Sequence, residues 1–98
     1  MPTYVLMTKL PPEISRKMKD RAAVGREWLN KVREKCPSVK FLGHYAVLGP
    51  FDFLDIYEAD NELEAAKVSM ISLAFGAERS ESWSAIPYNK FLELVEDL

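Results

Sequence analysis

Two side chains near the middle of the chain have the chemistry of an acid–base pair. His44 is the only histidine, and Asp55 follows it in the stretch FLGHYAVLGPFDFLDIYEA, residues 41–59. A carboxylate beside a histidine fixes the tautomer of the ring and supports its positive form, as a general acid or base requires. The same pair can instead be a structural hydrogen bond inside an interface. The sequence therefore makes His44 and Asp55 candidate catalytic residues, with a purely structural pair as the alternative.

The pair depends on a hairpin formed by the same stretch. Residues 39–48 and 51–58 alternate as two strands, and Gly49-Pro50 provides the turn between them. If the strands pair symmetrically about this turn, His44 lies opposite Asp55, Ala46 opposite Phe53, and Leu42 opposite Tyr57. A slip of one residue would separate the pair. Strict alternation predicts that the helices pack on Phe41, Tyr45, Val47, Leu54 and Ile56. It predicts that the other face carries Leu42, His44, Leu48, Phe51, Phe53, Asp55 and Tyr57.

Aromatic residues on the expected strands predict a pocket beside His44. We take four of them as candidate ligand-binding residues: Tyr4, Phe53, Tyr57 and Trp83. Aromatic side chains in such strands are also common as plain core or interface. The turn residues Gly49, Phe51 and Asp52 have a structural interpretation, in which the Asp52 carboxylate bonds backbone amides in or near the turn.

The rest of the chain supplies the elements that position this hairpin. We predict a strand over residues 3–10 and a helix over 12–36, with a bend or break near residues 21–25. A second helix follows an Asp60 N-cap, buries Leu63, Ala66, Met70, Leu73 and Ala74, and stops at Gly76. A last strand over residues 77–86 and a short helix after Pro87 complete the chain. This β-α-β-β-α-β order predicts one α+β domain over residues 1–98, with a ferredoxin-like four-stranded antiparallel sheet and both long helices on one face.

A sheet covered by helices on one face only leaves the other face to be explained. The side chains predicted there are largely apolar, and single domains rarely expose a patch of that size. A second copy laid sheet to sheet is the simplest cover. We therefore expect a homodimer formed through the sheet.

Composition narrows the classes of function. The net charge of −2 over 98 residues argues against nucleic acid as a partner. No apolar run approaches membrane-spanning length, and the first residues lack the features of a signal peptide. Cys36 is the only cysteine, which favours a reducing, cytoplasmic setting and a structural thiol. With one histidine and one cysteine we expect no metal site, and no motif implies a cofactor.

Three segments together resemble the GYD domain family. They are the YVLMTKL first strand, the LGPFDFL turn at residues 48–54, and SAIPYNKF at residues 84–91. The Gly-x-aromatic-Asp turn at Gly49, Phe51 and Asp52 is the most specific of these, although the family usually has tyrosine where Phe51 stands. The resemblance covers essentially the whole chain and implies a ferredoxin-like fold of the dimeric α/β-barrel group. It implies no catalytic residues, because the family has no established biochemical function.

Three functions are compatible with these observations. In the first, the protein binds a small organic molecule in a pocket between the sheet and its partner. Alternatively, it is a cofactor-independent monooxygenase-like or isomerase-like enzyme that uses His44, by analogy with related barrels. In the third, the sheet face is filled entirely by the partner, and the protein is a structural or interaction module without a ligand.

Overall fold

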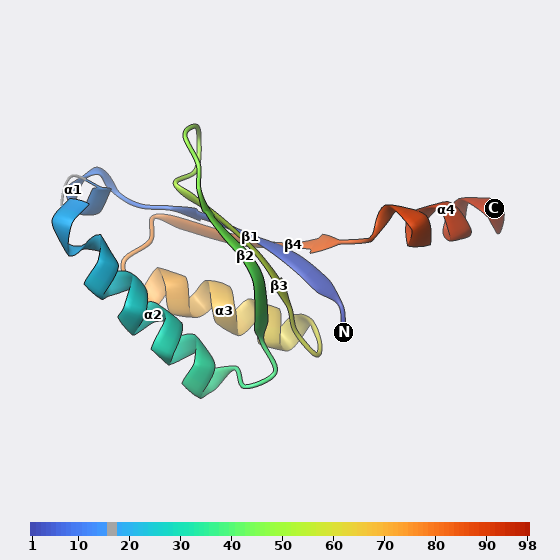
Figure 1. The fold of residues 1–98 in the computed structure, drawn as a ribbon, viewed down its shortest axis with the longest axis horizontal. Coiled ribbons are helices and arrows are strands. Elements are labelled where there is room, and N and C mark those ends of the chain that lie inside the picture. Colours follow the sequence, from blue (N-terminus) through green and yellow to red (C-terminus); the bar gives the residue numbers. More distant parts are fainter. Residues whose placement is uncertain (16–17) are drawn as a thin grey trace.

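The computed structural model describes residues 1–15 and 18–98, and these form the predicted β-α-β-β-α-β order with a further helix at the C-terminal end (Figure 1). The predicted α+β, ferredoxin-like order is therefore confirmed. The elements are β1 (Thr3–Lys9), α1 (Pro12–Ser15), the 3-10 turn η1 (Met18–Asp20), α2 (Arg21–Lys35), β2 (Lys40–Ala46), β3 (Phe53–Glu58), α3 (Glu62–Ala74), β4 (Arg79–Ala85) and α4 (Tyr88–Glu96).

The region predicted as one long helix over residues 12–36 is divided in the structure. It starts at Pro12, a residue type favoured in the first helical turn, but this first helix ends at Ser15. The long helix α2 begins at Arg21, within the range where a break was predicted, and runs to Lys35. The part of the prediction that concerns residues 16–17 lies outside the described residues.

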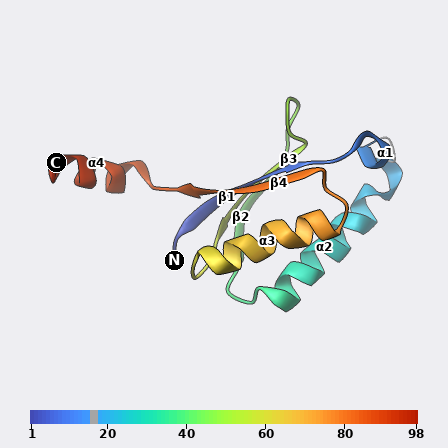
Figure 2. The same ribbon diagram turned by 180° about the vertical axis from the view of Figure 1, so that it is seen from behind.

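The four strands form one antiparallel sheet in the order β2-β3-β1-β4. Both long helices, α2 and α3, lie on the same face of this sheet, as Figures 1 and 2 show from opposite sides. The predicted arrangement of sheet and helices is confirmed. The other face, called the open face below, is covered by no helix of the described chain. It is made by Val5, Met7, Tyr45, Leu54, Ile56 and Trp83.

The core lies between the sheet and the two long helices. Its fully buried side chains come from every layer: Leu6 and Tyr57 from the sheet, Val32 and Cys36 from α2 and its C-terminal end, and Val68 from α3. Burying each of these large apolar side chains stabilises the fold by about 1.5–3 kcal/mol. The core therefore fixes how α2 and α3 sit on the sheet.

A β-bulge in β2 decides which hairpin residues face the helices. Phe41 pairs with Tyr57, whereas Gly43 pairs with Ile56, so the register shifts at Leu42. An extra residue in one strand reverses the alternation beyond it. The predicted pairings of His44 with Asp55 and of Ala46 with Phe53 are confirmed, because they lie between the bulge and the turn. The predicted pairing of Leu42 with Tyr57 is wrong.

The bulge also corrects the predicted faces of the hairpin. Phe41 packs on the core, as expected, and strict alternation would place Tyr45 beside it. Because the bulge intervenes, His44 follows Phe41 on the helix side, and Tyr45 points to the open face. The prediction was therefore wrong for most of the hairpin. Tyr45, Leu54 and Ile56 lie on the open face, while His44, Phe53, Asp55 and Tyr57 lie on the helix side.

Helix α3 also buries a different side from the predicted one. Its N-cap is Asn61 rather than Asp60, and the Asn61 side chain accepts hydrogen bonds from the backbone amides of residues 63 and 64 at 3.0 and 3.1 Å. Small side chains turn toward the sheet and let the helix approach it closely. The buried residues are Ala65, Val68 and Ser72. The larger residues predicted to be buried, Leu63, Met70 and Leu73, are exposed.

A chain of hydroxyl groups holds α3 on the sheet. The Tyr57 hydroxyl lies 2.8 Å from the Ser82 hydroxyl of β4, which in turn lies 2.9 Å from Ser69 of α3. Ser82 also donates to the backbone carbonyl of Ala65 at 3.3 Å. Buried polar groups need such partners, because leaving one unsatisfied costs about 1–3 kcal/mol. Ser82 thus has its partners on the helix side of β4, whereas Arg79, Glu81 and Trp83 lie on the other side of the strand.

An ion pair lies on the open side of the edge strand β4. Arg79 donates to Glu81 at 2.7 Å, and the indole nitrogen of Trp83 donates to the same carboxylate at 2.9 Å. Beyond this strand, α4 extends away from the body of the molecule (Figures 1 and 2).

Candidate functional site

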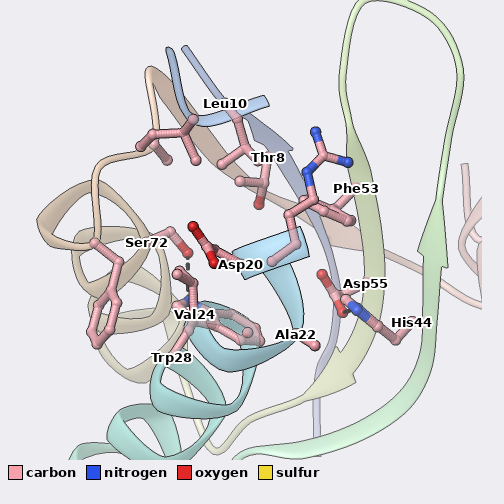
Figure 3. A pocket seen from close by; sticks show the side chains of 15 residues that line it. Thr8, Leu10, Asp20, Ala22, Val24, Trp28, His44, Phe53, Asp55 and Ser72 are labelled. Atoms are coloured by element: carbon pink, nitrogen blue, oxygen red, sulfur yellow. Dashed lines mark hydrogen bonds and ion pairs between the residues drawn. The ribbon is translucent and has the colours of Figure 1, made fainter. Parts of the chain in front are cut away.

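A cavity of about 530 Å³ lies between α2 and the helix-facing side of the sheet (Figure 3). The lining comes from the end of β1, from α1, η1 and α2, from the C-terminal end of α3 and the segment that follows it, and from the β2–β3 hairpin. Most of the lining side chains are apolar, among them Leu10, Ile14, Val24, Trp28, Phe53 and Phe75. The polar ones are Thr8, Asp20, Arg21, His44, Asp55 and Ser72. Both candidate catalytic residues therefore line one cavity.

His44 and Asp55 are hydrogen-bonded to each other at the rim of this cavity. The bond joins Nδ1 of His44 to Oδ1 of Asp55 across the pair of strands (Figure 3). Asp55 is almost fully buried, with 2% of its surface exposed, whereas 63% of the His44 side chain is accessible. The buried carboxylate is thus held in place by the fold, and the imidazole is the part that a ligand can reach.

Burial controls the acidity of this pair. Removal from water raises the pKa of the Asp55 carboxyl, and the hydrogen bond and charge of His44 oppose that rise with smaller effects. A carboxylate that accepts the Nδ1–H bond fixes the neutral tautomer and leaves Nε2 as an acceptor. The arrangement can accept a hydrogen bond or a proton from a bound molecule through His44.

An aromatic ring and a guanidinium group complete the rim. The Phe53 ring stacks on His44 at a centroid distance of 5.9 Å, and the Arg21 guanidinium lies 5.7 Å from the Phe53 centroid. A cation over an aromatic face contributes about 0.5–1 kcal/mol where it is exposed. Phe53 is the one predicted ligand-binding residue that lies in the cavity.

Trp28 forms the wall of the cavity opposite the sheet. Its indole Nε1–H donates to the Ser72 hydroxyl at 2.9 Å, which joins α2 to α3 (Figure 3). Trp28, Arg21, Asp20 and Ser72 were not predicted as site residues. Trp28 has a signal in the sequence, since it is an aromatic residue on the apolar side of its helix. The other three have none, because the cavity depends on how α2 lies on the sheet.

The other predicted ligand-binding residues lie elsewhere. Tyr4 and Tyr57 are buried in the core, where their rings stack with centroids 5.5 Å apart. Burial also raises the pKa of the Tyr57 phenol to about 12. Trp83 is on the open face, where its ring meets Phe51 edge-on at 6.3 Å. These three residues do not contribute to the cavity.

Asp52 has a structural contact that differs in detail from the predicted one. Its carboxylate accepts a hydrogen bond from the Leu10 backbone amide at 2.7 Å and lies 3.8 Å from the Lys9 ammonium. The bonded amide thus belongs to the exit of β1 and not to the turn itself. Asp52 ties the hairpin turn to the start of the segment that lines the cavity.

The lone thiol and the possible metal ligands are the remaining groups that could do chemistry. Cys36 is buried, and desolvation raises the pKa of its thiol, which opposes reactivity. Within residues 1–15 and 18–98, no three histidine, cysteine or acidic side chains are grouped closely enough to hold a metal ion.

Comparison with known proteins assigns the family. A model described as "GYD domain" matches residues 4–95, so the chain belongs to the GYD domain family, as the LGPFDFL turn indicated. The chain is also 26% identical over 87 residues to a glutamine synthetase and cystathionine beta-lyase binding protein of Thermus thermophilus, covering 89% of this chain and 90% of that protein. No solved structure matches the chain. None of the described helices is long and apolar enough to cross a membrane.

Proposed function

We propose that this protein is a homodimeric binding protein that holds a small organic molecule in the cavity between α2 and the sheet. The observation that carries the proposal is the cavity itself, whose lining is mostly apolar and has at its rim the accessible His44 bonded to the buried Asp55. Ligand sites are typically clefts of roughly 300–1,000 Å³ with apolar walls and a few placed polar groups. The proposed site is on the helix side of the sheet, and not between the sheet and a partner as the sequence suggested.

The lining defines the chemistry of the ligand. A flat apolar body would lie against Trp28 and Phe53, and a polar group on that body would face His44. Because Asp55 occupies Nδ1 of the imidazole, Nε2 is the nitrogen that a ligand hydroxyl or acid group would meet. The expected class is a small amphipathic ring compound with a hydrogen-bond donor at one end.

Binding of 8-anilinonaphthalene-1-sulfonate, an amphipathic aromatic probe, tests this site. Ala22 lines the cavity and the next residue, Ala23, is exposed but does not line it. We expect the probe to become fluorescent with the native protein and with Ala23→Phe, and to lose at least ten-fold in affinity with Ala22→Phe. Equal affinities for the two variants, with both folded by circular dichroism, would rule out the cavity as the site.

The His44–Asp55 pair also supports the enzyme alternative. A His44→Gln variant keeps a side chain of similar size that can donate or accept hydrogen bonds but cannot act as a base near neutral pH. If a ligand is found to be converted, loss of turnover with retained binding in this variant assigns the reaction to His44. If binding alone weakens, His44 is a binding residue.

The open face supports the homodimer. Apolar side chains from all four strands lie there without a covering helix, and Tyr45 and Trp83 are 56% and 47% exposed. Sheet-to-sheet packing would bury them as in a sandwich. We expect Tyr45→Glu to dissociate the dimer in analytical ultracentrifugation at micromolar concentration, whereas Leu63→Glu on the helix side leaves it intact. A monomeric native protein contradicts this part of the proposal.

Binding of another protein is the second candidate function, favoured by the name of the Thermus relative and by α3. The relative is described as binding glutamine synthetase and cystathionine beta-lyase. Helix α3 presents Leu63, Met70 and Leu73 to solvent at positions that share one side of a helix. Exposed apolar stripes of this kind are typical protein contact surfaces.

A pull-down with purified glutamine synthetase and cystathionine beta-lyase from the same source tests this candidate. We expect Met70→Glu to abolish capture and Leu48→Glu, the same change at a still more exposed apolar residue at the hairpin tip, to preserve it. Capture that is insensitive to Met70→Glu would exclude α3, and no capture by the native protein would exclude these two enzymes as partners.

A further inference from the structure

The C-terminal helix α4 has an apolar side and is fully exposed. Every residue from 86 to 98 is exposed, and α4 projects beyond the end of the sheet (Figures 1 and 2). Tyr88, Phe91, Leu92 and Val95 follow one another at helical spacing, while Asn89, Lys90, Glu93 and Glu96 occupy the other side. A nine-residue helix is marginal in water unless its apolar side is packed. The helix therefore needs a surface that its own chain does not provide in this arrangement.

The short connection to β4 directs α4 away from its own open face. Strand β4 ends at Ala85 and α4 begins at Tyr88, which leaves only Ile86 and Pro87 between them. Pro87 is extended, with φ −53° and ψ 136°, and its ring locks that φ. A residue before proline is also restricted to extended conformations. Reversal of the chain within these two residues is thus disfavoured, and α4 continues outward from the edge strand.

The chain exposes more surface than a compact monomer of its mass, and the excess is of the size that one subunit of a dimer buries. The chain has a solvent-accessible surface of 6892 Å², whereas a compact monomer of its mass has roughly 5,700 Å². Its radius of gyration is 14.7 Å, compared with about 12.6 Å for a compact chain of this length. The excess of about 1,200 Å² per chain corresponds to a total near 2,400 Å² for a pair, which lies in the range of obligate homodimers.

We infer that α4 is an arm that each copy of this chain lays against the other, so that the interface includes the two open faces and the two exchanged arms. The inference rests on the homodimer proposed above and adds the contact that holds it. It does not depend on the ligand site, which lies on the opposite side of the sheet.

A matched pair of substitutions in α4 tests the arm. Leu92→Glu places a charge on the apolar side, and Asn89→Glu places the same charge on the polar side. We expect Leu92→Glu to raise the dimer dissociation constant at least about 30-fold, the loss typical of a central interface residue, and Asn89→Glu to leave it within about three-fold. A dimer that is equally stable in both variants would overturn the arm while leaving the dimer through the open faces standing. A native protein that sediments as a monomer would overturn both.

Hydrogen exchange of the unmodified protein gives a measurement that does not rely on a variant. Amides of an unpacked nine-residue helix exchange almost as fast as those of an unfolded peptide. We expect residues 91–96 to become protected as the protein concentration rises through the dimer dissociation constant. Protection that persists where the protein sediments as a monomer would mean that α4 packs on its own chain, and absence of protection in the dimer would mean that α4 packs on neither chain. Either result excludes the exchanged arm.

Discussion

At the scale of single residues, Asp55 is the most informative side chain. Its carboxyl is almost fully buried, it accepts a hydrogen bond from the only histidine, and burial raises its pKa. The fold therefore keeps the Asp55 carboxyl away from water, where its ionised form would be better solvated. This makes the pair sensitive to pH as well as to substitution.

The pH dependence of stability reports the pKa of Asp55. The pKa of Asp55 in the folded state lies above its value in the unfolded chain, which is about 3.9. As the pH is lowered, the folded state therefore binds the proton at a higher pH than the unfolded state does. Its contribution to stability is full below the unfolded pKa and is lost as the pH rises through the folded pKa. The free energy of unfolding of the native protein minus that of Asp55→Asn should therefore fall as the pH is raised from 3 toward 7. Urea titrations at several pH values measure this difference in the free energy of unfolding. A difference that grows with pH would contradict a raised pKa of Asp55.

Tyr57 gives the second prediction at this scale. Its hydroxyl is linked to Ser82, and through it to α3. Tyr57→Phe should lower the free energy of unfolding by about 1 kcal/mol, because one buried hydroxyl loses its partner. Tyr88→Phe removes the same atom from an exposed ring and should change stability by less than about 0.5 kcal/mol. Equal effects in urea unfolding would show that the hydroxyl chain does not stabilise the fold.

At the scale of elements, the bulge in β2 places the site. Binary alternation describes each strand separately, but the shift of register at Leu42 brings Phe41 and His44 to the same side. The acid–base pair thereby faces α2 and the cavity, instead of the open face. The glycine in the bulge, Gly43, is close to the Tyr45 ring, since a Cβ there would lie 2.9 Å from a carbon of that ring.

Two glycines give opposite predictions at this scale. Gly76 ends α3 with φ +99°, and a Cβ there would lie 2.9 Å from Cδ1 of Ile14. Gly76→Ala should therefore destabilise the protein by about 1–2 kcal/mol. Gly25 lies inside α2 with open space around it, so Gly25→Ala should stabilise it by about 0.5–1 kcal/mol. Thermal unfolding of both variants checks the pair, and the same sign for both would contradict the backbone assignment.

At the scale of the whole molecule, the two faces of the sheet have different roles. The helix side holds the core and the cavity, and the open face and α4 present apolar side chains to solvent. If this surface is a dimer interface, the melting temperature of the native protein should rise with protein concentration, because association stabilises the folded state by mass action. We expect a rise of several degrees over a hundred-fold range of concentration by calorimetry, and a lower melting temperature in Leu92→Glu at each concentration, because its dimer is weaker. A constant melting temperature in the native protein would contradict this.

The sequence by itself determined the order of the elements, the antiparallel sheet with both long helices on one face, the pairing of His44 with Asp55, and the stop at Gly76. These features depend on local signals: alternation, turn residues and a histidine and an acid placed symmetrically about one turn. The tertiary structure decided the direction in which that pair points, the side that α3 buries, and the existence of the cavity. A bulge changes no residue type in the strand, and a cavity is formed by side chains from segments distant in sequence, so neither leaves a local pattern. Alternation alone assigned the acid–base pair to the open face. The β-bulge at Leu42 of β2 shifts the register, so the pair instead faces α2 and lines the same cavity as Trp28.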